Sequence, residues 1–144
     1  MSLSDELYRE IILDHYKNPR HAGRLDPADL RAEGNNPLCG DEIEITVNLR
    51  DGTIADIRFH GRGCSISQAS ASMMTENIVG KPIAEVEELV GLFKGMMLEN
   101  QEPDPERIGD LESLQGVKKY PVRIKCALLA WNTLLEALNE GSKK

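Results

Sequence analysis

A strand–turn–strand pattern in the first half of the chain constrains the fold most strongly. Aliphatic and polar residues alternate from residue 43 to residue 49, which is the period of a β-strand with one buried face. Asp51-Gly52 follows as a turn signal, and a second strand is expected to run through Phe59. The sequence therefore predicts an antiparallel hairpin whose first strand buries Ile43, Ile45, Val47 and Leu49.

The register of this hairpin can be argued from its apolar face. A two-residue turn would pair Arg50 with Thr53 and mix the polar and apolar faces of the two strands. A three-residue loop would instead pair Leu49 with Thr53 and keep one apolar face. At the open end of the hairpin, this second register places Cys39 beside Cys64. Its facing pairs would be Val47–Ala55, Ile45–Ile57 and Ile43–Phe59.

Segments with helical periodicity surround the hairpin in the chain. Helices are expected at residues 2–16, 65–79, 83–98, 110–116 and 121–139, with a short edge strand at 29–33 and a loop at 99–109. The length of 144 residues fits one domain spanning residues 1–144. These elements predict an α+β fold, a small antiparallel β-sheet with several α-helices packed on one face.

Composition excludes several classes of function. The net charge of -7 and the six aromatic residues disfavour binding to nucleic acid. No segment reaches the ~20 apolar residues that a membrane span needs. Three cysteines leave one unpaired in any disulfide scheme, which fits a reducing cytoplasm better than export.

Four residues have the chemistry of metal ligands. Cys39 and Asp41 are separated by one glycine, so a single turn can aim both side chains at one atom. Cys64 precedes the helix expected at residues 65–79, and the predicted hairpin brings it next to Cys39. Cys126 lies away from the apolar stripe of the last helix, whereas an ordinary core cysteine would lie within that stripe. This set suits a tetrahedral zinc ion or an iron–sulfur cluster at the open end of the sheet.

The histidines are not expected to take part in this site. His15 is expected to be a partly buried helix residue, His21 a solvated loop residue, and His60 a strand residue on the polar face. Basic residues that could offset the negative charge of the ligands are Arg62, Arg123 and Lys125.

The segments around the cysteines resemble the three cysteine motifs of the IscU/NifU-N iron–sulfur cluster assembly family. The first expected helix and the residues after it resemble the opening helix of that family, so the resemblance covers nearly the whole chain. The matching segments are Tyr8 to Arg20, Asn36-Pro37-Leu38-Cys39-Gly40-Asp41, Gly61-Arg62-Gly63-Cys64-Ser65-Ile66-Ser67 and Arg123-Ile124-Lys125-Cys126.

Within the family, the chain is most similar to the SufU branch. The IscU branch has a histidine before the third cysteine, where this chain has Lys125. It also has a Leu-Pro-Pro-Val-Lys chaperone motif, where this chain has Lys119-Tyr120-Pro121-Val122-Arg123. The segment 95–116 resembles the insertion that marks SufU proteins. The resemblance therefore argues against a dedicated Hsp70-type chaperone partner.

The resemblance implies a cytoplasmic sulfur acceptor that holds zinc through Cys39, Asp41, Cys64 and Cys126. Such a protein takes persulfide sulfur from a SufS-type cysteine desulfurase and passes it to downstream SUF components of cluster assembly. Two alternatives remain open: a scaffold that assembles a transient 2Fe-2S cluster on the same ligands, and a structural zinc module that binds a partner.

Cys39 is the expected sulfur carrier among the three cysteines. Cys64 is tied to a helix start and Cys126 lies inside a helix, so moving either would disturb packed structure. Cys39 lies between Pro37 and Gly40, where backbone rotation costs little.

Overall fold

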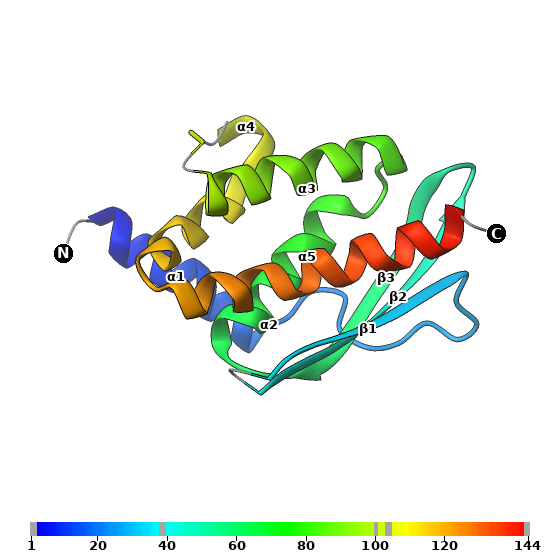
Figure 1. Ribbon diagram of the computed structural model, residues 1–144, viewed down its shortest axis with the longest axis horizontal. Coiled ribbons are helices and arrows are strands. Elements are labelled where there is room, and N and C mark those ends of the chain that lie inside the picture. The colour runs from blue at the N-terminus through cyan, green and yellow to red at the C-terminus, as the bar shows by residue number, and fades with distance from the viewer. Residues whose placement is uncertain (1–2, 38–39, 100, 103–104, 143–144) are drawn as a thin grey trace.

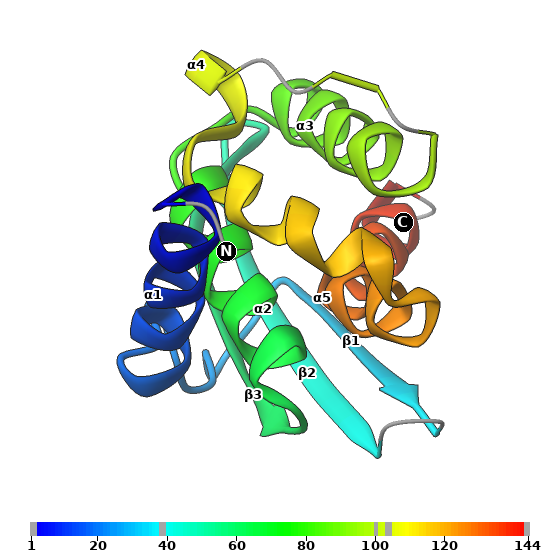
Figure 2. The ribbon, with the colours of Figure 1, turned by 90° about the vertical axis from the view of Figure 1, so that its left-hand side faces the viewer.

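The computed structural model describes residues 3–37, 40–99, 101–102 and 105–142. The helices gather on one side of a three-stranded sheet, with α2 and α5 next to the strands and α3 farther away (Figures 1 and 2). The predicted α+β arrangement is confirmed. No helix in the described parts of the chain is long and apolar enough to cross a membrane. The elements are α1 (Leu3–Lys17), β1 (Leu30–Asn36), β2 (Asp41–Arg50), β3 (Thr53–Arg62), α2 (Ser65–Ile78), α3 (Ile83–Leu98), α4 (Pro105–Ile108), the 3-10 helix η1 (Gly109–Lys119) and α5 (Pro121–Ser142).

The sheet is antiparallel throughout, in the order β1-β2-β3. Its inner face is apolar because the alternating aliphatic residues of β2 point toward the helices, where Ile45 and Val47 are completely buried. Helix α2 consists largely of small residues, so it packs closely against β3 and against α5, which covers β1 and β2. One of these residues, Ser70, joins the two helices: its hydroxyl donates to the Ala127 carbonyl at 2.6 Å and accepts the Trp131 indole N–H at 3.0 Å.

The hairpin register differs from the predicted one. Arg50 pairs with Thr53 across Asp51-Gly52, whose φ angles of 53° and 74° are those of a type I′ turn. A bulge close to the turn then makes Ala55 the extra residue on β3. The predicted three-residue loop is therefore wrong, because a bulge brings the apolar faces of the two strands back into alignment. The observed facing pairs are Val47–Ile57, Ile45–Phe59 and Ile43–Gly61.

Strand β1 runs farther than the short edge strand that was predicted, and it ends at Asn36. Gly34 allows this extension because β1 lies directly on α5. A Cβ atom at Gly34 would collide with the Thr133 hydroxyl and would lie 3.3 Å from a methyl carbon of Leu129. Because β1 packs so closely on α5, its last residue, Asn36, lies beside Cys126.

The last third of the chain also differs from the prediction. The segment expected to be a loop contains the short helix α4, and the short helix expected after it is the longer 3-10 helix η1. Helix α5 begins at Pro121 as predicted and is buried on more than one side. Trp131, in the predicted stripe, is fully buried and stacks on Phe93 with ring centroids 4.5 Å apart. Ile124 and Leu135, from the same stripe, are only partly buried.

Candidate metal centre

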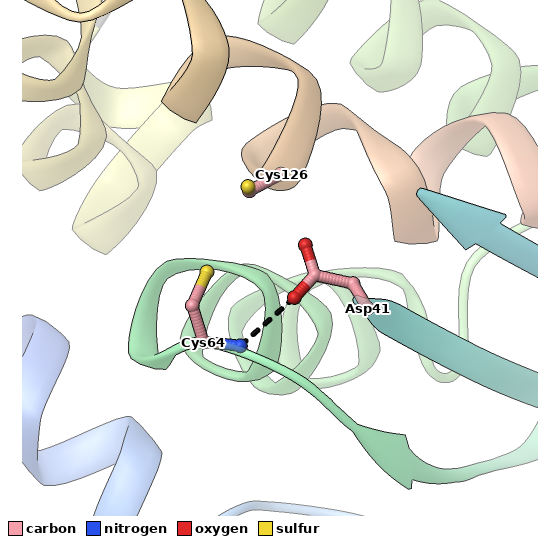
Figure 3. Close-up of side chains that lie close together, drawn as sticks. All are labelled: Asp41, Cys64 and Cys126. Carbon is pink, nitrogen blue, oxygen red and sulfur yellow. Dashed lines mark hydrogen bonds between the residues drawn. The ribbon is translucent and has the colours of Figure 1, made fainter. Parts of the chain in front are cut away.

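Asp41, Cys64 and Cys126 meet at the open end of the sheet, although each belongs to a different element. Asp41 is the first residue of β2, Cys64 is the N-cap of α2, and Cys126 lies in the second turn of α5. One potential ligand atom from each residue lies within 4.8 Å of the other two. The two sulfurs and the carboxylate face a common space (Figure 3). The fold thus brings together three of the four predicted ligands, while Cys39 lies outside the described residues.

Asp41 is fully buried, which is unusual for a carboxylate. Its Oδ1 atom accepts the backbone N–H of Cys64 at 2.9 Å, the bond drawn in Figure 3. Its Oδ2 atom is buried and has no hydrogen-bond partner among the described residues. A buried carboxylate oxygen that lacks a donor is costly, and a cation beside it would remove that cost.

Gly63 allows Asp41 to lie against the start of α2. A Cβ atom at this position would lie 2.6 Å from the Ser67 hydroxyl oxygen and closer still to Asp41 Oδ1. Both distances are shorter than real Cβ contacts. The absence of a side chain at residue 63 is therefore what brings the carboxylate and the Cys64 backbone within hydrogen-bond distance.

Cys64 is positioned by the first turn of α2. Its Sγ atom accepts the backbone N–H of Ser67 at 3.5 Å, and its own carbonyl accepts the Ser67 hydroxyl at 3.1 Å. The residue is half-buried. Negative charge on this sulfur is favoured because it lies at the positive end of the helix dipole.

Cys126 is completely buried beneath the end of β1. Asn36, the last residue of that strand, points its side-chain amide at the sulfur, with Nδ2 3.6 Å from Sγ. The end of β1 therefore covers this face of α5. Asn36 was not singled out from the sequence, although it begins the first cysteine motif. Nothing in its residue type reveals that its side chain turns toward residue 126.

The donor set of this cluster fits a metal ion. Two thiols and one carboxylate are ligands that zinc and iron–sulfur clusters accept, and the Asp41 carboxylate, which has one unpaired oxygen, lies close to both sulfurs. The site therefore has the chemistry to bind a metal through Asp41, Cys64 and Cys126. A fourth ligand would complete a tetrahedral set.

The basic residues that were expected to offset the charge of the site are all exposed. Arg62 forms an ion pair with Glu42, at 3.0 Å, and both side chains are largely in solvent. Arg123 and Lys125 lie on α5 close to Cys126 in sequence.

Two of the histidines lie on or beside the outer, polar side of the sheet, away from the metal site. His60 Nε2 lies 2.7 Å from Glu44 Oε1, and Arg31 donates to the other Glu44 oxygen at 2.6 Å. Burial raises the pKa of Glu44, but the hydrogen bonds from His60 and Arg31 outweigh it, so the pKa lies below its ordinary value. His21, expected to be solvated, is half-buried and lies 2.7 Å from an Arg58 guanidinium nitrogen.

The chain as a whole has counterparts among known proteins. The sequence model of the NifU-like N-terminal domain family matches residues 7–138, which is most of the chain. The protein belongs to this family. Family membership identifies it as an iron–sulfur cluster assembly protein of the SufU/IscU type.

Two curated relatives are similar over nearly their whole length. The zinc-dependent sulfurtransferase SufU of Bacillus subtilis is 48% identical over 130 residues, which are 90% of this chain and 88% of that protein. The iron–sulfur cluster assembly scaffold protein IscU of Streptococcus pyogenes is 42% identical over 142 residues, covering 99% of this chain and 89% of that protein.

Solved structures share the fold as well. A protein from Fervidobacterium islandicum, described as an iron–sulfur cluster assembly scaffold for the SUF system, superposes with a TM-score of 0.86 at 39% identity. The match covers 94% of this chain and 98% of that chain. The N-terminal part of a NifU-like protein from Brucella abortus gives a TM-score of 0.89 at 26% identity, covering 99% of both chains.

Proposed function

We propose that this protein is a zinc-holding sulfur acceptor in iron–sulfur cluster assembly. It receives sulfur from a SufS-type cysteine desulfurase and passes it to downstream SUF components. The observation that carries the proposal is the cluster of Asp41, Cys64 and Cys126 with its unpaired carboxylate oxygen. In addition, this chain is 48% identical to a relative named as a zinc-dependent sulfurtransferase.

Asp41, Cys64 and Cys126 would hold the zinc, with Cys39 as the fourth ligand. When bound, the ion supplies positive charge that keeps the cysteines deprotonated and slows their oxidation. The chain itself supplies the remaining control of these groups. The N-terminus of α2 favours negative charge on Cys64, and the Asn36 amide donates toward the Cys126 sulfur.

The transfer is a thiol–disulfide exchange that conserves electrons. The Cys39 thiolate attacks the outer sulfur of a persulfide on the desulfurase, and a new sulfur–sulfur bond forms on Cys39. The bond between the two desulfurase sulfurs breaks, and the desulfurase cysteine leaves as a thiolate. The desulfurase has regained its thiolate, and this chain carries the persulfide.

Cys39 is assigned the carrier role because its neighbours in the chain allow movement. Gly40 has a φ of 69°, and a Cβ atom there would meet no other atom within 4 Å. Pro37, on the other side, is exposed. Cys64 and Cys126, by contrast, are anchored in α2 and α5, where displacement would disrupt helix packing.

A scaffold function is the second candidate, and the IscU relative at 42% identity favours it. In that case the same side chains would hold a 2Fe-2S cluster while it is built. Elemental analysis of protein purified without oxygen or added metal separates the two functions. Zinc alone supports the sulfur acceptor, and iron with acid-labile sulfide supports the scaffold.

Mapping the transferred sulfur tests the proposal directly. The protein is incubated with a SufS-type desulfurase and cysteine, and the added sulfur is located by mass spectrometry. Wild type should carry it on Cys39, and Cys39→Ser should carry none. Persulfide on Cys64 or Cys126 of the Cys39→Ser variant, formed at the wild-type rate, would contradict the assignment of the carrier.

A further inference from the structure

A second group of potential ligands surrounds His15, far from the cysteines. His15 lies on α1 and is only 1% exposed, so it is more deeply buried than the sequence suggested. Its Nδ1 atom is 2.8 Å from the Ser72 hydroxyl of α2. Its Nε2 atom is buried and has no hydrogen-bond partner among the described residues. A buried imidazole nitrogen without a partner is rare and needs a physical explanation.

Two carboxylates face this nitrogen. Asp110, at the start of η1, has Oδ2 3.7 Å from His15 Nε2, and a carboxylate oxygen of Glu76 on α2 lies within 4.8 Å of both other ligand atoms. The distance of 3.7 Å is too long for a hydrogen bond. It is close to the ~3.3–3.6 Å that separates two ligands bound at ~2.0–2.2 Å to one tetrahedral ion.

The charges around this group favour a divalent cation. Arg20 is the positive group that faces it, and its guanidinium lies 3.2 Å from Glu76 and 2.7 Å from Asp14. Three carboxylates and one guanidinium leave two negative charges in excess. Burial, followed by the positive charge of Arg20, lowers the pKa of His15 and so disfavours its protonated form. A neutral ring whose Nδ1–H donates to Ser72 offers a lone pair at Nε2.

We propose that His15 Nε2, Glu76 and Asp110 form a second metal site, which binds a divalent first-row transition ion. One imidazole nitrogen and two carboxylates form a harder donor set than the cysteine site, and this set suits Mn²⁺, Fe²⁺ or Zn²⁺. Solvent reaches the site from the acidic side, because Glu76 and Asp110 are about half exposed while His15 closes the inner side.

This site is separate from the cysteine centre. Helix α2 carries a member of each, and the 12 residues from Cys64 to Glu76 correspond to about 18 Å along the helix axis. The proposed ligands come from α1, α2 and η1, and α1 lies beside α2 in the fold (Figure 2). A bound ion would join three elements and raise the melting temperature of the protein.

Mn²⁺ is the probe of choice, because carboxylates bind it well and thiolates bind it poorly. Protein that already carries zinc at the cysteine centre is titrated with Mn²⁺, and the electron paramagnetic resonance signal of free Mn²⁺ reports the unbound ion. Wild type should bind one Mn²⁺ per chain. Asp110→Asn should weaken this binding about tenfold or more, since second-shell changes alone often cost that much. The change removes a charge from a half-exposed side chain, so the fold should tolerate it.

Glu87→Gln is the matched control, because it removes the same charge from an exposed position on α3. It should leave Mn²⁺ affinity unchanged. A second readout is nuclear magnetic resonance, in which bound Mn²⁺ should broaden the ring signals of His15 more strongly than those of the other histidines. No binding at millimolar Mn²⁺, equal weakening by both variants, or unbroadened His15 signals during binding would each overturn the proposal.

Discussion

Replacing Gly63 with alanine should damage the metal centre without touching any ligand. The new Cβ atom would lie 2.6 Å from the Ser67 hydroxyl oxygen and closer still to Asp41 Oδ1, whereas ordinary contacts begin at 3.4 Å. The Asp41 carboxylate must therefore withdraw by about 1 Å. That movement breaks its 2.9 Å hydrogen bond to the Cys64 backbone and shifts a ligand away from the two sulfurs.

The expected size of the effect follows from these contacts. A hydrogen bond to a charged acceptor contributes about 1.5–3 kcal/mol, so Gly63→Ala should lower the free energy of unfolding of the metal-free protein by roughly that amount. Zinc affinity should fall about 10–100-fold, as is typical when the groups that orient a ligand are changed. Urea unfolding in the presence of reductant measures the first quantity, and competition with a chromophoric chelator measures the second.

Gly91→Ala is the control for this substitution. Gly91 lies inside α3, and a Cβ atom there would meet nothing within 4 Å, so alanine should leave zinc affinity unchanged and raise stability by ~0.5–1 kcal/mol. The reasoning would be refuted if Gly63→Ala bound zinc with wild-type affinity. In that case the close approach at residue 63 would not be what places Asp41.

Three further predictions concern the surroundings of the site and the sheet. Asn36→Ala should weaken zinc binding roughly tenfold in a chelator competition because it removes the amide beside the Cys126 sulfur, while Asn35→Ala, on the opposite face of β1, should have no effect. Glu44→Gln should cost ~1–2 kcal/mol of unfolding free energy at neutral pH. The lowered pKa of Glu44 means that this stabilisation is present above its ordinary value of 4.5 and disappears as pH falls through the lowered value, so wild type and variant should converge in acid urea titrations. Removal of zinc with a chelator should leave most of the helical circular dichroism signal, because the buried core extends well beyond the site, through the sheet and helices α2, α3 and α5. Loss of cooperative melting in the metal-free protein would contradict this.

The hairpin illustrates what the sequence could and could not predict. The alternation of aliphatic and polar residues is a property of the strand itself, so both strands and the reversal of the chain at Asp51-Gly52 were predicted, although the loop type was not. The register depended on a bulge that inserts Ala55, and a bulge leaves the residue pattern of each single strand unchanged. Helix α3, which has a clear apolar face, was predicted to its end residues for the same local reason.

The candidate site shows the same division. The residue types and motifs singled out Asp41, Cys64 and Cys126, which the fold brings together. Asn36 and the length of β1 were missed, because both depend on how β1 packs on α5. Gly34 and the asparagines have weak strand propensity, and they are extended here because α5 accepts a strand without side-chain bulk at that point.

The three gathered ligands also set a time at which the site can form during synthesis. Asp41 and Cys64 are 23 residues apart and are made early, whereas Cys126 is carried by α5, the last element of the fold. The chain is synthesised from its N-terminus, so α5 can enter the space beside β2 and α2 only after the rest of the domain has been made. A nascent chain therefore lacks the Cys126 ligand until α5 has been made. Metal loading becomes a property of the folded domain, and chains that lack α5 are excluded from it by topology.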